Sequence, residues 1–222
     1  FKAKKGQTIA VIGSTGSGKS TLINLIPRYY DVTKGSVKVD GVDVRDMTQK
    51  ELRDKLGYVP QKGVLFSGTI DSNIRYGKPE ITDAQVKEAA EVAQATEFID
   101  TKPEKYESPV SQGGTNVSGG QKQRLSIARA IAKDPEIFIF DDSFSALDFK
   151  TDSQLRKALK EYTKDATTVI VAQRISTILG ADQIIVLDDG HMAGIGTHKE
   201  LMANCEVYQQ IARSQLSEEE LA

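Results

Sequence analysis

A glycine-rich stretch near the N-terminus constrains the fold of this chain more than any other feature. It reads Gly13, Ser14, Thr15, Gly16, Ser17, Gly18, Lys19, Ser20. The β-branched, apolar run 8–12 precedes it and predicts a buried strand, and a helix is expected from Thr21 onward. Glycines let the backbone turn its N–H groups inward, and a helix N-terminus adds a positive dipole end. The order of strand, loop and helix predicts a cradle for the phosphates of a nucleoside triphosphate.

Individual positions in this loop have separate expected roles. We expect Lys19 to reach the β and γ phosphates and the Ser20 hydroxyl to ligate Mg²⁺. Thr21, the next residue, is counted with the nucleotide-binding positions. The alternative is a Gly/Ser-rich loop that only turns a corner, which eight ordered positions between a strand and a helix disfavour. ATP and Mg²⁺ are therefore the predicted cofactors.

Composition excludes several other classes of protein. The 222 residues carry a formal net charge of -2, so no basic excess favours nucleic-acid binding. No apolar run reaches the roughly 18 residues that a membrane span needs. The single cysteine, Cys205, excludes an internal disulfide framework. His191 and His198 lack companions at metal-ligand spacing and are expected in surface or capping roles.

Two predicted strand ends carry further candidates. The strand 56–59 is followed by Gln61, whose amide oxygen could hold Mg²⁺ or an attacking water, although a plain loop amide is the alternative. The apolar strand 137–140 delivers Asp141 and Asp142 to the carboxyl edge of a parallel sheet, where ligands bind. We expect Asp141 to hold Mg²⁺ and Asp142 to polarise the attacking water. A solvated strand end is the competing interpretation.

A second helix start lies far along the chain from the loop. Ser118, Gly119, Gly120 and Gln121 precede an apolar pattern of helical spacing. Such a start can bind phosphate oxygens through its N–H groups. Nothing requires one subunit to direct both helix starts at the same phosphate, so a partner's nucleotide is the expected target. A serine-capped helix without a ligand is the alternative.

The remaining patterns complete an α/β organisation. The segment 62–134 is nearly all helical, with a capped start at Thr82, and is typical of a separate lobe. Elsewhere the patterns predict a hairpin over 35–44, a helix capped by Thr48, a helix from about Thr151, strands over 167–171 and 183–188, and a turn into a helix over 194–201. The Glu218-Glu219-Glu220 tail is expected to be solvated.

Taken together, these motifs resemble the nucleotide-binding domain of ABC transporters over nearly the whole chain. The stretch 64–70 is similar to the exporter branch. The resemblance implies a RecA-like P-loop NTPase core over 1–61 and 135–222, a helical subdomain over 62–134, and a small antiparallel β-subdomain. It also implies that the first strands and the adenine-stacking aromatic lie upstream of Phe1, and that Asp148 contributes to nucleotide binding.

The resemblance further implies partners and a location. Two such domains would form a head-to-tail dimer that sandwiches ATP between one phosphate loop and the other subunit's 118–121 segment. ATP binding would close the dimer, and hydrolysis would reopen it. Transmembrane domains, on the same polypeptide, would contact the 62–134 subdomain with Gln61 as the hinge. The domain would then lie at the cytoplasmic face of the cell membrane.

Departures from the family pattern indicate a specialised copy. Asp142 replaces the family's catalytic glutamate, and Gln173 replaces the switch histidine and cannot become cationic. Ser111-Gln112 also replaces the usual Gly-Glu. We therefore expect a degenerate site that binds ATP and hydrolyses it slowly, in a heterodimer whose partner site is completed by residues 118–121. Four alternatives stay open: a DNA-repair or chromosome-structuring ABC ATPase, a regulatory clamp without transport, a soluble translation factor of the same superfamily, and a homodimer with two slow sites.

Overall fold

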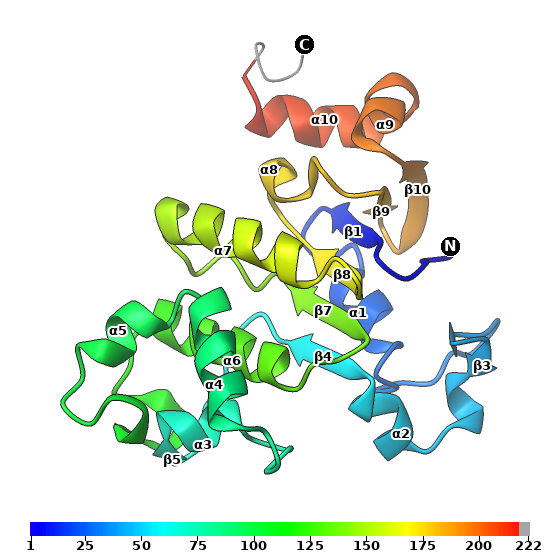
Figure 1. Ribbon diagram of the computed structural model, residues 1–222. Helices are drawn as coiled ribbons and strands as arrows, with labels where there is room; N and C mark the ends of the chain where they lie inside the picture. Colours follow the sequence, from blue (N-terminus) through cyan, green and yellow to red (C-terminus); the bar gives the residue numbers. More distant parts are fainter. Residues whose placement is uncertain (218–222) are drawn as a thin grey trace.

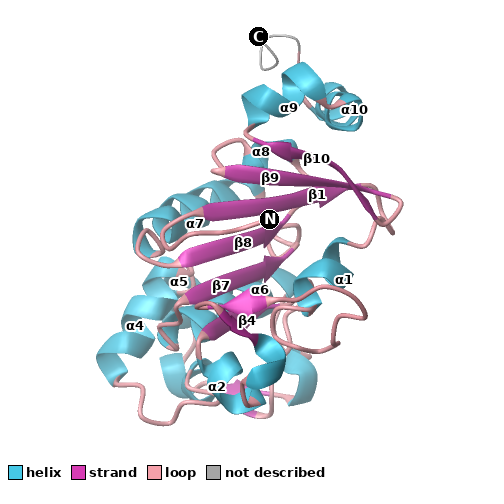
Figure 2. Cartoon of the chain, turned by 90° about the vertical axis from the view of Figure 1, so that its right-hand side faces the viewer, coloured by secondary structure: helices cyan, strands magenta, loops and turns pink. Residues whose placement is uncertain are grey.

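A six-stranded sheet forms the centre of the computed structural model, which describes residues 1–217. The predicted 218–220 tail lies outside the described residues. Five strands are mutually parallel and the sixth is an antiparallel edge. In spatial order they are β10 (His191–Gly196), β9 (Gln183–Asp188), β1 (Thr8–Gly13), β8 (Thr167–Val171), β7 (Ile137–Asp141) and β4 (Leu56–Val59). Figure 2 shows them stacked in this order. Parallel strands align their carboxyl ends, so their last residues share one edge.

Helices cover both faces of the sheet, as strands buried on two sides require. On one face, α1 (Lys19–Asn24) and α2 (Gln49–Asp54) contribute Ile23 and Leu52 to a core with Val11 and Ile139. The opposite face packs against α7 (Phe149–Tyr162), and near β9 against α8 (Ile175–Ile178), α9 (His198–Asn204) and α10 (Glu206–Gln215). Figure 2 shows α1 and α7 on opposite sides of the strands.

Helices predominate between β4 and β7. They are α3 (Ile70–Ile74), α4 (Asp83–Val92), α5 (Thr96–Asp100), α6 (Gly119–Ala132) and the 3₁₀ turns η2 (Lys105–Glu107) and η3 (Gln112–Gly114). A short ribbon pairs β5 (Gly68–Thr69) with β6 (Pro109–Val110). Thr82 caps α4 as predicted. The core of this segment includes Leu125 of α6 and continues into Phe138 of β7, so the segment is packed onto the sheet. Figure 1 shows it beyond β4, at the end of the sheet opposite α9 and α10.

The predicted hairpin after α1 is confirmed as β2 (Lys38–Val39) and β3 (Val42–Asp43). Its turn residues Asp40 and Gly41 both have left-handed φ, +51° and +80°, as a tight hairpin turn requires. The turn η1 (Val44–Asp46) follows.

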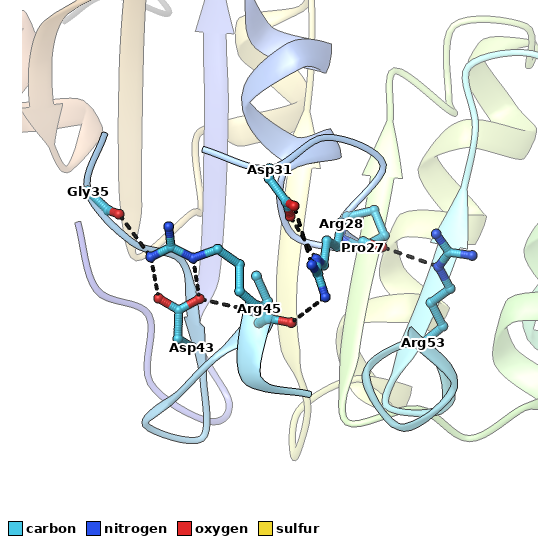
Figure 3. A network of polar contacts seen from close by, with 8 residues as sticks. Pro27, Arg28, Asp31, Gly35, Asp43, Arg45 and Arg53 are labelled. Carbon is cyan, nitrogen blue, oxygen red and sulfur yellow. Dashed lines mark hydrogen bonds and ion pairs between the residues drawn. The ribbon is translucent and has the colours of Figure 1, made fainter. Parts of the chain in front are cut away.

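Side chains tie this segment to its surroundings, and Figure 3 shows the network. Arg45 bonds the carboxylate of Asp43 at 2.8 Å and the Gly35 carbonyl at 3.3 Å. Arg28 pairs with Asp31 at 2.7 Å. In addition, Arg53 of α2 donates to the Pro27 carbonyl at 3.2 Å, which joins α2 to the end of the α1 region. These contacts stabilise the connection between α1 and β4.

The structure shifts some predicted boundaries. The helix after the glycine-rich loop begins at Lys19, two residues before Thr21, and α7 begins at Phe149 because Asp148 caps it. The prediction of a turn from residue 194 is wrong, since 191–196 form β10. A register shift between Met192 and Gly194 breaks the alternation that would reveal a strand. Within residues 1–217, no helix is both long and apolar enough to cross a membrane.

Candidate functional site

The glycine-rich loop joins the carboxyl end of β1 to α1 and is built from tight turns. The Ser17 N–H donates to the Ser14 carbonyl at 3.2 Å. Gly16 and Gly18 have φ of +84° and +97°, which side chains rarely adopt. A Cβ at Gly13 would lie 2.1 Å from the Leu187 carbonyl oxygen of β9. The sequence therefore needs glycine at 13 for space and at 16 and 18 for backbone conformation.

Lys19 folds back over the mouth of this loop. Its Nζ donates to the carbonyls of Gly13 at 2.8 Å and Ser14 at 2.7 Å. Burial lowers the pKa of Lys19, while the carboxylates of Asp142 and Asp141 act in the opposite direction. The ammonium group is thus held at the loop, between backbone carbonyls and within the field of two acidic strand-end residues.

Asp141, the last residue of β7, contacts α1, the helix that follows the glycine-rich loop. It is buried, and its Oδ1 accepts a hydrogen bond from the Ser20 hydroxyl at 2.9 Å. The Tyr58 hydroxyl lies 3.3 Å from its Oδ2 and 3.0 Å from Asn24 Oδ1, and its single proton is shared between these two acceptors. Sequence reasoning brought Ser20 and Asp141 to the same edge but missed Tyr58 and Asn24. The signal for Tyr58 was a polar hydroxyl in the otherwise apolar strand that ends beside Gln61.

Asp142 faces a different set of partners, as expected for neighbouring residues at a strand end. Gln61 Nε2 donates to its Oδ2 at 3.1 Å, and Gln173 Nε2 donates to the same oxygen at 2.7 Å. Its backbone φ of +48° is left-handed, and its N–H donates to the Val171 carbonyl at 3.0 Å. Burial raises the pKa of Asp142, and the nearby Asp141 raises it further, whereas the hydrogen bond from Gln61 opposes the rise. Gln61 therefore contacts Asp142 rather than the Ser20 and Asp141 pair.

The turn between β9 and β10 also contacts the loop, which the sequence did not suggest. The Gly190 N–H donates to the Ser17 carbonyl at 3.2 Å. Asp189 and Gly190 both have positive φ, +43° and +78°. This contact ties the β9–β10 turn to the glycine-rich loop.

The second predicted helix start is a capping box at the beginning of α6. Ser118 Oγ accepts from the Gln121 N–H at 3.2 Å, and Gln121 Oε1 accepts from the Ser118 N–H at 3.1 Å. A Cβ at Gly120 would lie 3.5 Å from the Ala146 carbonyl oxygen, so this start packs beside the turn after β7. Among residues 1–217, no hydrogen bond joins 118–121 to the loop 13–21.

Asp148 serves as the N-cap of α7. Its Oδ1 accepts from the Thr151 N–H at 2.9 Å, and its Oδ2 from the Thr151 hydroxyl at 2.7 Å. These hydrogen bonds lower the pKa of Asp148. Both carboxylate oxygens are thus engaged within the helix that follows.

The loop has the features that a polyphosphate and a magnesium ion require. Ser17 Oγ is buried without a hydrogen-bond partner, and the space beside the Gly16 Cα is open. The first N–H groups of α1, at Lys19, Ser20 and Thr21, have no acceptor within the helix. Mg²⁺ binds one or two protein oxygens together with phosphate oxygens. Ser20 and Asp141 can supply the protein oxygens. Consistent with so few protein ligands, no group of three His, Cys, Asp or Glu side chains in the described chain forms a metal site.

Comparisons with known proteins identify the family. The model of the ABC transporter family matches residues 1–145. An uncharacterized ABC transporter ATP-binding protein of Mycobacterium tuberculosis is 50% identical over 216 residues, which are 96% of this chain and 37% of that protein. A candidate multidrug export ATP-binding/permease protein of Staphylococcus aureus is 48% identical over 208 residues, 94% of this chain and 36% of that protein.

A solved structure agrees with the sequence relatives. A bacterial Atm1-family ABC exporter with ATP bound matches 96% of this chain and 38% of its own chain, with a TM-score of 0.92 and 39% identity. This chain thus spans little more than a third of the length of these relatives. The match confirms the predicted α/β fold of the P-loop NTPase class. With its fold and its sequence in agreement, the chain belongs to the ABC transporter family.

Proposed function

We propose that this chain is the Mg²⁺-ATP-binding domain of an ABC exporter and that its own nucleotide site hydrolyses ATP slowly. One observation carries the proposal: Ser20 and Lys19 of the glycine-rich loop converge with Asp141 and Asp142 at one sheet edge. The relatives named for multidrug export and the exporter structure support the transport role.

Residues of the loop would divide the work of holding the nucleotide. The N–H groups of residues 14–21 and the orphan Ser17 hydroxyl would bind phosphate oxygens, because inward N–H groups and a buried donor suit an anion. Lys19 would exchange its loop carbonyls for the β and γ phosphates. Ser20 and Asp141 would hold Mg²⁺, with Gln61 next to them in the closed state. The ion supplies neutralisation of the charge on the phosphates.

The contacts of Asp142 support the proposal of a slow site. A general base is most effective when it lies within hydrogen-bond reach of the attacking water. Oδ2 of Asp142 instead accepts from two amides, Gln61 and Gln173, and its side chain is one methylene shorter than glutamate. Gln173 can donate a hydrogen bond but cannot carry a positive charge to the γ phosphate. Base assistance contributes about 10² to 10⁴ in rate, so its loss leaves binding without rapid cleavage.

The separation of the two helix starts supports a dimer. Residues Ser118 to Gln121 have no hydrogen bond to the loop of their own chain within residues 1–217 and lie at an exposed helix start. They would bind the nucleotide of a second, head-to-tail domain, with Asp148 at the same boundary. The helix start at 118–121 retains the family pattern, whereas positions 142 and 173 depart from it. The partner is therefore a different chain, whose nucleotide site hydrolyses ATP faster.

The same family relationship supports our proposal for the wider assembly. We divide the chain into an ATP-binding core, 1–61 and 135–222, and a helical subdomain, 62–134. The helical subdomain would contact transmembrane domains on the same polypeptide, at the cytoplasmic face of the cell membrane. ATP-driven closure of the dimer would power substrate efflux.

The test is ATP turnover by the assembled pair. Asp142→Ala should lower total turnover far less than removal of the partner's corresponding carboxylate. Equal losses from the two substitutions would contradict the asymmetry. Turnover that needs no second domain, or ATP-dependent retention of DNA on a filter, would contradict the exporter role.

A further inference from the structure

One buried side chain of α6 holds the segment that carries Gln61. Gln123 is 1% exposed and lies in the second turn of the helix that Ser118 caps. Its Oε1 accepts from the Gly63 N–H at 2.9 Å, and its Nε2 donates to the Pro60 carbonyl at 3.0 Å. A single amide therefore satisfies a backbone group on each side of Gln61.

Backbone packing reinforces this attachment. A Cβ at Gly63 would lie 2.8 Å from the Lys122 carbonyl oxygen and 2.9 Å from Ser126 Oγ, both in α6. Only a residue without a side chain allows the 60–63 segment to lie this close to the helix. The segment is consequently fixed to α6 by two hydrogen bonds and by direct backbone contact.

From this arrangement we propose that Gln123 is a positioning residue that couples the placement of Gln61 on Asp142 to the placement of Ser118. This inference rests on the proposed function and deepens it. Since both loop ends are attached to α6, a displacement of the helix carries the 60–63 segment with it. When Ser118 moves with the helix, Gln61 Nε2, which lies 3.1 Å from Asp142 Oδ2, moves away from or toward this carboxylate oxygen. One rigid connection thus joins this chain's nucleotide site to the helix start that serves the partner's site.

A purely structural role makes a different prediction. If Gln123 only satisfies two buried backbone groups, its loss destabilises the chain and its effect adds to that of any change at Gln61. If it acts through the 60–63 segment, the loss of either side chain breaks the same connection. The two substitutions together should then be no worse than one.

The experiment is a double-mutant cycle in the intact protein assembled with its partner. Gln123→Met keeps the length of the side chain and removes both hydrogen bonds. In the assembly with the partner's site inactivated, where turnover reports only this chain's own site, we expect the loss of two hydrogen bonds to lower turnover about tenfold, with KM for ATP changed less than about twofold. Gln61→Ala should give the same pattern, and the double variant should match the lower single variant. Gln209→Met is the matched control and should leave turnover unchanged, because Gln209 lies in α10, at the other edge of the sheet from the 60–63 segment, and donates to the Met202 carbonyl at 2.8 Å.

Two further variants keep the test decisive if Gln123→Met folds poorly. Gln123→Glu retains the acceptor for the Gly63 N–H and loses the donor to Pro60, so its turnover should be intermediate. Gly63→Ala should force the segment off the helix and reproduce Gln61→Ala. Multiplicative losses in the double variant, or full turnover in Gln123→Met, would overturn the proposal. Failure of the proposed function is recognised separately, because Lys19→Ala would then leave ATP binding intact.

Discussion

Gln173 Nε2 donates a hydrogen bond of 2.7 Å to Asp142 Oδ2. Two of the positions that depart from the family pattern, 142 and 173, are therefore direct partners. Gln61 donates to the same oxygen at 3.1 Å, so two neutral amides hold one carboxylate. These two contacts of Asp142 are the basis on which we propose slow hydrolysis at this site.

Restoring both departures together should accelerate hydrolysis. Asp142→Glu extends the carboxylate toward the water, and Gln173→His supplies a side chain that can become cationic. In the intact assembly with the partner's site inactivated, the double variant should turn over ATP at least about tenfold faster than the unmodified chain, within the range of general-base catalysis. Either single substitution alone should give less, because the two side chains contact each other.

Lys19 should strengthen the binding of Mg²⁺-ATP. Its ammonium group donates to two loop carbonyls at 2.8 and 2.7 Å, which phosphate oxygens can replace. Lys19→Ala should weaken Mg²⁺-ATP binding by about tenfold or more, the loss expected for charge-assisted hydrogen bonds. Titration of the intact protein with a fluorescent ATP analogue measures this. Lys199→Ala changes an exposed lysine of α9, outside the loop and the 60–63 segment, and is the matched control that should bind normally.

The glycines 13 and 119 should separate stability from function. Gly13→Ala places a methyl group 2.1 Å from the Leu187 carbonyl oxygen, and overpacking of this kind costs about 1–3 kcal/mol of unfolding free energy.

In Gly119→Ala, the added Cβ has no atom within 4 Å and the backbone needs no positive φ, so the Tm should be unchanged or slightly higher. The same Gly119→Ala should still lower turnover at the partner's site about tenfold, because an added methyl group blocks close approach of a phosphate to the helix start. Normal turnover in Gly119→Ala would contradict the assignment of 118–121.

Two carboxylates should give opposite pH dependence of stability. Burial raises the pKa of Asp142 in the fold, so the fold binds its proton more tightly than the unfolded chain does. Its contribution is most favourable below the unfolded pKa and is lost as pH rises through the folded pKa. Asp142→Asn should therefore raise Tm, increasingly so from about pH 4 toward neutrality.

Asp148 provides the control of opposite sign. Hydrogen bonds from Thr151 lower its pKa, so its contribution is present above the unfolded pKa and is lost as pH falls through the folded pKa. Asp148→Asn should leave Tm unchanged in acid and lower it near neutrality. Thermal unfolding without nucleotide, measured from acid to neutral pH, compares the two variants. Parallel Tm profiles for both would contradict the assigned environments.

Sequence reasoning reached the parts of this site that depend on chain order. The glycine-rich loop, the strand before Asp141 and the placement of Asp141 and Asp142 at the carboxyl edge all follow from local pattern and from the shared edge of parallel strands. The fold class followed from the same alternation of strands and helices.

The remaining contacts depend on three-dimensional placement. That Gln61 and Gln173 share one oxygen of Asp142 depends on the left-handed φ of Asp142, which no residue pattern indicates. Tyr58 reaches Asp141 because β4 lies beside β7, a neighbour that strand order in the chain does not specify. The Gly190 contact with Ser17 likewise depends on β9 and β1 being adjacent.

A structure of the intact protein with its partner, Mg²⁺ and a non-hydrolysable ATP analogue tests the central claim most directly. The account predicts Lys19 Nζ and the residue 14–20 N–H groups within about 3 Å of phosphate oxygens, with the ion against Ser20 and Asp141. It also predicts Ser118 of this chain at the partner's nucleotide. Lys19 remote from every phosphate, or Ser118 facing away from the partner's nucleotide, would contradict it.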